Sequence, residues 1–210
     1  ARVQPAVAGG PAITGTGLSD TLTGTARSEQ ISGAAGDDVI FGDSGEALQT
    51  TGSNLIVNGS FETSGPVNSS ASWGISNTTL PGWTKTNASN FEQVISGTQS
   101  VAATDGRYWL DLDGAGSDGN MVISQEIAGL AAGEELILSF DHANRTSAAS
   151  GSFQVLWNGA VIATYSTTGV TMIRERLLVT AIEGANTLTF RGTGTVDTNG
   201  ASLDNVQLHQ

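Results

Sequence analysis

From residue 54 onward the chain is a series of short apolar or alternating runs separated by Gly, Asn and Ser. Alternation with period two places side chains on the two faces of a strand, and no run shows the period of an amphipathic helix. Many short strands joined by short turns are typical of an antiparallel sandwich or jelly roll. We therefore predict an all-β, antiparallel jelly-roll β-sandwich over residues 54–210. The predicted strands are 55–61, 82–84, 91–96, 108–113, 121–127, 135–143, 152–158, 160–166, 172–181, 186–192 and 201–208.

The turn between the predicted strands 152–158 and 160–166 can be predicted from its own two residues. Asn158 and Gly159 stand between two apolar runs. This dipeptide favours a two-residue type I′ turn, because both of its residues tolerate a positive φ. The flanking runs are therefore predicted to form a hairpin.

The N-terminal part has a different pattern, a nine-residue repeat. The units begin at Gly15, Gly24 and Gly33 and read GTGLSDTLT, GTARSEQIS and GAAGDDVIF. The sixth position is acidic in every unit: Asp20, Glu29 and Asp38. A glycine turn followed by a short strand makes one unit, and two units complete one coil, so residues eighteen apart should stack. We predict a short parallel β-roll over residues 13–48, in which Asp20, Asp38 and turn carbonyls form an oxygen-rich site suited to Ca²⁺.

These units resemble the RTX nonapeptide repeat of exported bacterial proteins, G-G-x-G-x-D-x-U-x, over about residues 13–46. The match is strongest in GAAGDDVIF and weakest in the middle unit, where a glutamate replaces the aspartate. The resemblance implies a Ca²⁺-binding roll with Asp20 and Asp38 as ligands and with Gly33 and Gly36 shaping the turn. The alternative is a set of ordinary turns in a leader segment.

Net charge and composition argue against several classes of binding partner. The 210-residue chain has a net charge of −12, and its eight Lys and Arg residues are scattered. Nucleic acids and anionic membranes require clustered cations, so neither is an expected partner. The chain has no cysteine and no apolar run of the roughly 18 residues that a membrane span needs. We expect no disulfide and no membrane insertion. The abundance of Gly, Thr, Ser and Asn favours a secreted or cell-surface β protein, with residues 1–12 as a tail or linker.

Five motifs follow one another along the larger part of the chain: NLIVNGSFE, LPGW, GLAAGEELILSFD, WNG and LDNVQL. Over about residues 54–210, their order and spacing resemble the galactose-binding-like jelly-roll domains, a superfamily that includes many carbohydrate-binding modules. The resemblance implies a structural Ca²⁺ between the first and last strands, held by Glu62 and Asp204. The alternative is that both acids are exposed turn residues.

The period-two pattern also suggests where a ligand would bind. In YWLDLD the leucines share one face, and Trp109 and Asp111 share the other. The same alternation predicts that Asp141 and Arg191 point outward. Trp109, Asp111, Asp141 and Arg191 are therefore predicted to lie together on one outer face. An aromatic ring beside carboxylates and an arginine suits a sugar, because the ring covers apolar C–H groups and the charged groups bind hydroxyls. The alternative is that Trp109 belongs to the core.

Two further candidates lie outside the predicted strands. Trp73 is in the polar segment SSASWGIS, and Arg145 follows a predicted strand. Both are candidate ligand contacts, because binding groups concentrate in loops. Trp83 and Trp157, in contrast, are predicted to be core residues.

The sequence contains no recognisable catalytic set. His142 adjoins Asp141 on a predicted strand, so the two side chains should point to opposite faces. There is no G-x-S-x-G motif, no H-x-x-x-H motif and no cysteine. DLDGAGSDGN is not an EF-hand, because Val122 stands where a bidentate Glu belongs. A looser Ca²⁺ contact through Asp113 or Asp118 remains open.

We therefore predict a non-catalytic, Ca²⁺-dependent carbohydrate-binding module of a secreted bacterial protein, with a polysaccharide or glycan as its partner. The alternative is a structural or adhesive module of a large surface protein without a small ligand. Buried tryptophans and an outer face of Thr and Ser would favour that alternative. A polysaccharide-cleaving enzyme, the third class, would need a deep cleft with two close carboxylates. The sequence predicts neither the glycan nor the oligomeric state.

Overall fold

The structure is a computed structural model. It describes residues 12–23, 30–37, 39–41, 52–65, 67–88, 90–114, 119–146 and 151–210. The chain divides into two compact units, Ala1–Thr50 and Thr51–Gln210. Apart from one 3₁₀ turn, η1 (Thr98–Ser100), every regular element in the described ranges is a β-strand, which confirms the predicted all-β class. None of the described ranges contains a helix long and apolar enough to cross a membrane.

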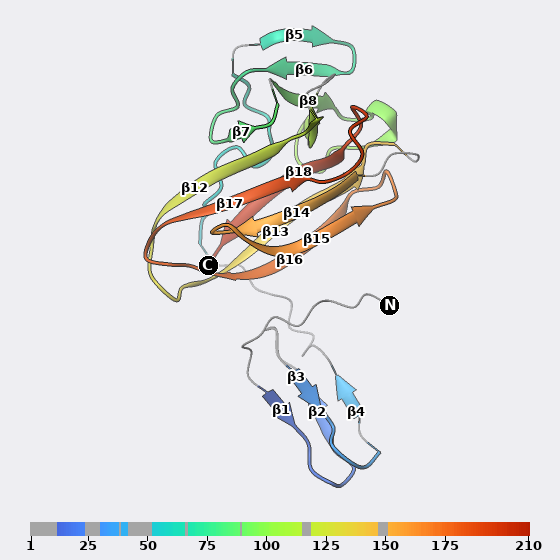
Figure 1. Cartoon of the computed structure of the whole chain (residues 1–210), viewed down its shortest axis with the longest axis vertical. Coiled ribbons are helices and arrows are strands. Elements are labelled where there is room, and N and C mark those ends of the chain that lie inside the picture. The colour runs from blue at the N-terminus through green and yellow to red at the C-terminus, as the bar shows by residue number, and fades with distance from the viewer. Residues whose placement is uncertain are drawn as a thin grey trace. The chain divides into compact units, whose positions relative to one another are not determined.

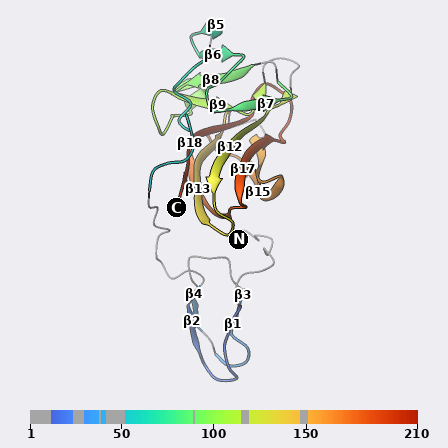
Figure 2. The ribbon, with the colours of Figure 1, turned by 90° about the vertical axis from the view of Figure 1, so that its left-hand side faces the viewer.

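The first unit contains four short strands that pair in parallel. They are β1 (Ala12–Thr14), β2 (Thr21–Thr23), β3 (Gln30–Ser32) and β4 (Val39–Phe41). In one ladder β1 pairs with β3, so that Ala12 faces Gln30, and in the other β2 pairs with β4, so that Thr21 faces Val39. Figure 2 shows the two ladders opposite each other within this unit. Partners are eighteen residues apart in both ladders, as expected when two nine-residue units complete one coil.

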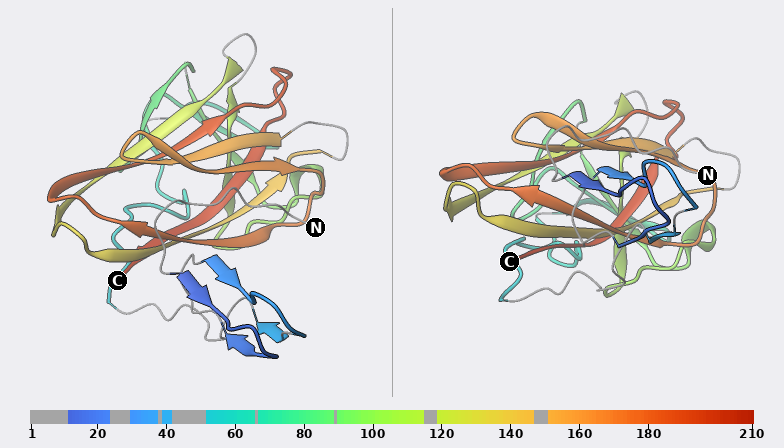
Figure 3. Two further views of the ribbon diagram at one scale, coloured as in Figure 1. Left: turned by 60° about the horizontal axis from the view of Figure 1, so that its bottom comes forward. Right: turned by 90° about the horizontal axis from the view of Figure 1, so that it is seen from below.

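The second unit is a sandwich of two antiparallel sheets (Figure 1). The five-stranded sheet has the order β15 (Ala160–Thr167), β14 (Gly151–Trp157), β17 (Gly184–Gly192), β12 (Val122–Leu130), β7 (Thr84–Thr86). The seven-stranded sheet has the order β16 (Ile173–Thr180), β13 (Glu135–Asn144), β18 (Ala201–His209), β9 (Tyr108–Asp111), β8 (Phe91–Ile95), β6 (Gly74–Asn77), β5 (Val67–Ala71). A small ladder joins β10 (Asp113–Gly114) to β11 (Gly119–Asn120). The two large sheets lie face to face in Figures 2 and 3.

The main core fills the space between the two sheets. Its fully buried members include side chains that the period-two pattern predicted to point inward: Leu110, Leu112, Leu136, Leu138, Phe140, Leu188 and Phe190. Trp83 and Trp157 are also buried in this core, as predicted. The hairpin between β14 and β15 is confirmed as well, since Asn158 and Gly159 both have positive φ angles, 52° and 81°.

A second, smaller core lies on the outer face of the seven-stranded sheet. It consists of Val94, Val101, Trp109 and Ala143, with Trp73, Ala103, Val170 and Met172 packed against it as partly buried neighbours. Val94 and Trp109 are cross-strand partners on β8 and β9. The segments around residues 101–103 and 170–172 therefore cover part of a face that period two alone would leave in solvent.

Two predictions of strand positions were wrong. Residues 55–61 do not form a strand, because Asn58 and Phe61 adopt positive φ angles of 53° and 57° and bend the chain. The Asn58 side chain fixes this bend: its amide donates to the carbonyls of Thr63 and Pro81, and its Oδ1 accepts from the Thr63 N–H. The polar segment SSASWGIS, residues 69–76, was expected to be a loop and lies instead in the hairpin of β5 and β6.

Candidate functional site

The side chain of Arg145, the first residue after β13, lies over the outer face of the seven-stranded sheet. Its Nη1 donates to Asp111 Oδ2 at 2.6 Å, to Glu92 Oε2 at 3.1 Å and to the carbonyl of Thr198 at 2.8 Å. Its Nε donates to Gln99 Oε1 at 2.7 Å. Glu92 and Asp111 reach the same guanidinium because they are directly opposite each other on β8 and β9.

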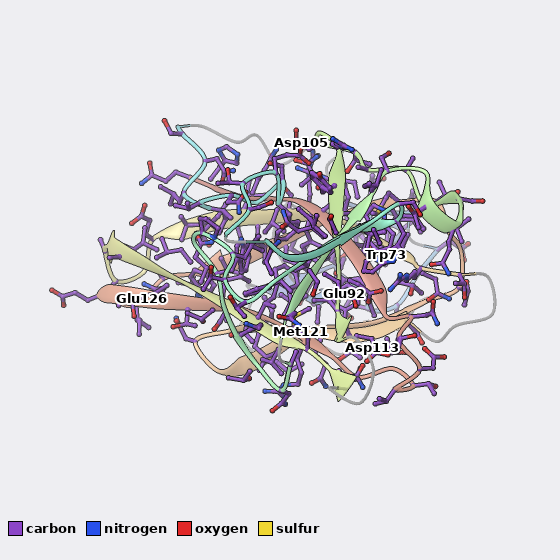
Figure 4. All side chains as sticks on the ribbon, turned by 90° about the horizontal axis from the view of Figure 1, so that it is seen from above. Trp73, Glu92, Asp105, Asp113, Met121 and Glu126 are labelled. Atoms are coloured by element: carbon purple, nitrogen blue, oxygen red, sulfur yellow. The ribbon has the colours of Figure 1, made fainter. Side chains whose placement is uncertain are left out.

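Two tryptophan rings flank this guanidinium. Arg145 Cζ is 5.7 Å from the ring centre of Trp73 and 5.9 Å from that of Trp109, within the roughly 6 Å over which a cation attracts an aromatic face. Trp109 is completely buried, whereas Trp73, in the tight turn between β5 and β6, is half-buried. Trp73 and Glu92 lie toward the same part of the domain in Figure 4, and Glu126 of β12 lies far from them. Of the two flanking rings, Trp73 therefore offers the accessible surface.

The two carboxylates share one arginine in a place that solvent hardly reaches. Burial raises the pKa of Asp111 to about 7, the charge of Glu92 adds to this rise, and the charge and hydrogen bond of Arg145 oppose it. Arg145 itself is 9% exposed. The proton occupancy of Asp111 is therefore sensitive to pH near neutrality.

Two buried acids fix the loop that precedes β18. Asp111 Oδ1 accepts the backbone N–H groups of Asp113 and Gly200 at 2.8 and 3.0 Å. Asp113 Oδ2 accepts those of Asp197 and Thr198 at 2.9 and 2.7 Å. These bonds hold the loop against β9 and bring the Thr198 carbonyl to Arg145. Asp118, the other acid considered for a loose Ca²⁺ contact, lies outside the described residues.

Two amide side chains complete the site at its edge. Gln99 Nε2 approaches Asn199 Oδ1 at 3.4 Å, and Gln99 is exposed. The sequence suggested Arg145 and Trp73 as candidate ligand contacts, but it did not suggest Gln99 and Glu92. The alternation of Phe91, Glu92 and Gln93 indicates that Glu92 faces away from the core, but no sequence signal predicts the contact of Gln99 with Arg145.

Two expectations for the outer face were wrong. Trp109 is not an exposed platform, because its ring is fully buried in the second core. Arg191 does not join Trp109, because it belongs to β17 in the other sheet, where it is exposed and approaches Gln154 Oε1 at 3.4 Å. Asp111 shares the face of Trp109, as predicted, but it is buried against Arg145 rather than exposed to a ligand.

Asp141 belongs to a separate group on the same sheet. Its Oδ2 accepts from Thr104 Oγ1 at 2.6 Å and from Asn205 Nδ2 at 3.0 Å, and it lies 3.3 Å from Arg174 Nη1. His142 points the other way, as predicted, with its Nε2 3.5 Å from Glu175. Asp141 is thus a buried, well-bonded acid rather than an exposed sugar contact.

Glu62 and Asp204, distant in sequence, converge on the loop of residues 104–108. Glu62 Oε1 accepts the backbone N–H groups of residues 107 and 108 at 2.7 and 2.6 Å. Asp204 Oδ2 accepts those of residues 104 and 105 at 2.7 and 3.0 Å. Burial raises the pKa of Asp204 to about 6. Both acids thus hold one loop in place, and we call this arrangement the clamp.

The donor chemistry of the clamp suits a hard cation. Within the described structure Glu62 Oε2 accepts no hydrogen bond, and Asp204 Oδ1 accepts one, from the N–H of Asn205 at 2.7 Å. A carboxylate has about four lone-pair sites, so Glu62 retains acceptor capacity at Oε2. Asp204 already accepts four hydrogen bonds, three of them at Oδ2, so only its Oδ1 has a lone pair left. The described residues contain no group of three or more acidic or histidine side chains arranged for a metal. Ca²⁺ at the clamp would therefore also use carbonyl oxygens or water, as it commonly does.

The first unit places Asp20 in a turn of the β-roll. Asp20 Oδ2 accepts the backbone N–H of Thr16 at 2.6 Å and its hydroxyl at 2.9 Å, so the carboxylate closes this turn. Asp38, the predicted partner for Ca²⁺, lies outside the described residues. An oxygen-only donor in a stacked turn suits Ca²⁺.

Gly15 and Gly36 allow neighbouring turns to stack closely, and Gly33 contributes the carbonyl oxygen that a Cβ at Gly15 would meet at 2.5 Å. The backbone N–H of Gly15 donates to the carbonyl of Ser32 at 2.8 Å. Gly36 has a φ of +124°, and a Cβ at this position would lie 2.6 Å from the carbonyl oxygen of Leu18. A side chain at Gly36 is therefore excluded by both backbone conformation and space.

No family model matches the chain. Two curated relatives share sequence with it, both named multifunctional-autoprocessing repeats-in-toxin. The protein from Vibrio cholerae serotype O1 is 39% identical over 88 residues, which is 41% of this chain, and the one from Vibrio vulnificus is 31% identical over 130 residues, which is 56% of it. The chain spans 2% of the length of each relative.

Several solved structures have a similar arrangement of strands. A family 35 carbohydrate-binding module from Clostridium thermocellum has a TM-score of 0.39 and 15% identity, with coverage of 60% of this chain and 90% of the module. The CBM35 from Paenibacillus barcinonensis has a TM-score of 0.41 and 19% identity. The match covers 62% of this chain and 94% of the CBM35. Tailspike protein 4 of bacteriophage CBA120 has a TM-score of 0.48 and 14% identity. The match covers 87% of this chain and 25% of the tailspike chain. These TM-scores are too low to support a functional conclusion.

Proposed function

We propose that the jelly-roll unit is a non-catalytic carbohydrate-binding module. The observation that carries this proposal is the half-buried ring of Trp73 beside the guanidinium of Arg145. An indole face covers the apolar C–H groups of a sugar ring, and neighbouring polar groups bind its hydroxyls. The single most accessible tryptophan of this unit therefore lies where hydrogen-bonding groups are already gathered.

The groups around Trp73 supply both donors and acceptors. Arg145 Nη2 makes no hydrogen bond to the described residues, so its two N–H groups are available to a ligand. Each amide group of Gln99 and Asn199 already makes one hydrogen bond at its oxygen and one at its nitrogen, which leaves one lone pair and one N–H of each for a ligand. Because Glu92 and Asp111 lie next to the guanidinium, we propose that the ligand is uncharged rather than anionic.

This function is tested by a glycan array followed by calorimetric titration of the full chain. Trp73→Ala should weaken binding by about 1–3 kcal/mol, the range seen when a stacking or interface aromatic is truncated. Trp73→Tyr, which keeps an aromatic face, should retain most of the affinity. Thr187→Ala, on the outer face of the five-stranded sheet, is the control and should leave binding unchanged. Unchanged binding by Trp73→Ala would place the sugar elsewhere.

A second function, that of a structural or adhesive spacer, is favoured by the other tryptophans and by the outer face of the five-stranded sheet. Trp83, Trp109 and Trp157 are all buried. The outward positions of the described sheet include no aromatic residue. Glu126, Gln154 and Arg191 point outward, together with eight hydroxyl-bearing residues: Thr84, Thr86, Ser124, Ser152, Thr164, Ser166, Thr187 and Thr189. A chain that binds no glycan on the array, with or without Ca²⁺, would support this second function.

We propose no catalytic role, because the close carboxylates Glu92 and Asp111 are buried beneath Arg145 rather than at a cleft. We also propose that Ca²⁺ binds the β-roll at Asp20 and Asp38, and the jelly roll at the clamp. Secretion or cell-surface display is supported by the sequence shared with the two repeats-in-toxin proteins.

A further inference from the structure

A pocket of about 220 Å³ lies between the segments 100–104 and 170–172. Ala102, Ala103, Val170 and Met172 give it apolar walls, and Ser100 and Thr171 add hydroxyls. Neither hydroxyl makes a hydrogen bond to the described residues. The pocket therefore combines an apolar interior with two groups that can each donate and accept.

The pocket walls and Trp73 pack against the same small core. Trp73, Ala103, Val170 and Met172 all pack on the second core of Val94, Val101, Trp109 and Ala143. The pocket therefore lies on the same covered part of the seven-stranded sheet as the candidate sugar platform.

Three consecutive residues of η1 join the parts of this region. Thr98 Oγ1 donates to the carbonyl of Trp73 at 3.3 Å, Gln99 Oε1 accepts from Arg145, and Ser100 lines the pocket. Gln99 and Ser100 both have positive φ angles, 52° and 70°, which non-glycine residues rarely adopt. Such conformations persist where surrounding contacts impose them, and they concentrate at functional sites.

The size and lining of the pocket indicate what it would hold. Pockets for drug-sized ligands measure about 300–1,000 Å³, so this one is too small for an oligosaccharide and has room for one small group or at most one sugar ring. No Lys, Arg or His lines it, so it offers no counter-charge to a carboxylate or sulfate group. A small group with a methyl, an N–H and a carbonyl would match its apolar walls and its hydroxyls.

We propose that this pocket receives the acetamido group of an N-acetylhexosamine whose ring lies toward Trp73. The methyl group packs against Val170, Met172 and the alanines, and the amide exchanges hydrogen bonds with Ser100 and Thr171. This inference rests on the proposed carbohydrate binding and names the sugar class that the site selects. An acetamido group explains both the apolar walls and the unpaired hydroxyls, which a plain hydroxyl or a deoxy methyl group would not.

The test compares ligands that differ at one substituent. The full chain is titrated calorimetrically with β-1,4-linked N-acetylglucosamine oligosaccharides, with their de-N-acetylated forms and with cello-oligosaccharides of equal length. O-acetylated and 6-deoxy glycans form two further arms. We expect the N-acetylated ligand to bind at least about tenfold more tightly than the others, because a site built to bond an amide rejects analogues that lack it.

Two variants then test whether the preference for the acetamido group arises in this pocket. Ala102→Trp fills the pocket from its exposed rim and should remove the preference for the acetamido group, while Ala132→Trp makes the same change at an exposed turn between β12 and β13 and should leave it intact. Circular dichroism and melting curves confirm that both variants are folded.

The outcomes separate this inference from the proposed function. Binding of glycans without preference for the acetamido group would overturn the inference and leave carbohydrate binding standing. A preference for O-acetyl or 6-deoxy sugars, or a preference that survives Ala102→Trp, would overturn it too. An absence of binding to every glycan would overturn both.

Discussion

Arg145 Nη1 lies 2.6 Å from Asp111 Oδ2 in a position where the carboxylate has no exposed surface. The same nitrogen is 3.1 Å from Glu92 Oε2. A buried ion pair of this kind adds little stability over apolar residues, but removal of one partner leaves an uncompensated charge. Arg145 is therefore required for the fold at the end of the domain where Trp73 lies.

Replacement of this arginine should destabilise the jelly roll strongly. At pH 8, above the pKa of about 7 of Asp111, we expect Arg145→Ala to lower the free energy of unfolding by about 3–5 kcal/mol, because Asp111 and Glu92 would remain buried without their cation. At roughly 2–4 °C per kcal/mol, this corresponds to a drop in Tm on the order of 10 °C. Differential scanning calorimetry of the full chain measures it.

Arg191→Ala is the matched control for this change. Arg191 is exposed and makes one long contact, to Gln154 at 3.4 Å. Its removal should alter the free energy of unfolding by less than about 0.5 kcal/mol. Equal effects of the two variants would show that the buried cluster contributes nothing specific.

The jelly roll should be more stable at pH 5 than at pH 8 when Ca²⁺ is chelated. Burial raises the pKa of Asp111 to about 7 and that of Asp204 to about 6, from 3.8. Between these values and the unfolded pKa the native state binds more protons than the unfolded chain, so the free energy of unfolding decreases as pH rises through this window. Urea unfolding at several pH values measures the slope.

Asp111→Asn tests whether Asp111 causes this decrease in the free energy of unfolding with rising pH. The variant cannot ionise, so its stability should depend less on pH between about 4 and 7 than that of the parent protein. The asparagine also loses the ion pair, so its absolute stability should be lower. A parent protein that loses stability as pH falls from 8 to 5 would contradict the raised pKa values.

The sequence predicted those parts of the fold that depend on local pattern. Period two identified the inward side chains of β9, β13 and β17, because a half-buried strand must alternate. Asn158-Gly159 predicted its hairpin, because both residues adopt positive φ. The nine-residue repeat predicted the pairing of Thr21 with Val39, because two units make one coil.

The candidate site depended on tertiary contacts that local pattern does not contain. Period two placed Trp109 outside the main core, which is correct, but the segment near Val101 covers that outer face and buries the ring. Arg191 shares its outward direction with Asp111, yet strand order puts them in different sheets. Arg145 was identified by its place after a strand, whereas the contact with Gln99 depends on the positive φ of a 3₁₀ residue.

Calcium should bind the β-roll through the acidic sixth position of its units. Asp20→Asn and Asp38→Asn should each reduce the number of Ca²⁺ ions bound by the full chain, measured by isothermal titration calorimetry. Asp37→Asn is the control, because it changes the neighbouring acid and should leave the stoichiometry unchanged. Equal loss in all three variants would indicate attraction by general negative charge rather than a site.

The close stacking of the turns leads to a separate expectation for Gly36. Gly36→Ala should weaken Ca²⁺ binding without removing a ligand, because a Cβ would lie 2.6 Å from the Leu18 carbonyl oxygen at a φ of +124°. Displacement of that carbonyl would open the turn. Unchanged Ca²⁺ affinity in this variant would show that the turn carbonyls are not part of the site.

At the clamp, hydrogen bonding and Ca²⁺ binding can be separated by one pair of substitutions. Glu62→Gln keeps a side-chain oxygen that accepts the N–H groups of residues 107 and 108 but loses the charge, whereas Glu62→Ala loses both. With chelator, we expect Glu62→Gln to melt close to the parent protein and Glu62→Ala to lose about 0.5–1.5 kcal/mol, since two solvent-exposed backbone donors exchange their acceptor for water. Glu183→Gln, in an exposed turn, is the control.

Addition of Ca²⁺ then decides whether the clamp holds a metal. A ligand at 100 times its Kd stabilises the native state by about 2.7 kcal/mol, so the Tm of the jelly roll should rise in the parent protein and in Glu183→Gln. Both Glu62 variants should lack this rise, because a neutral amide is a poor ligand for a hard cation. A full Ca²⁺ response in Glu62→Gln would mean that the metal binds without Glu62, and no response in the parent protein would mean that hydrogen bonds alone hold the loop.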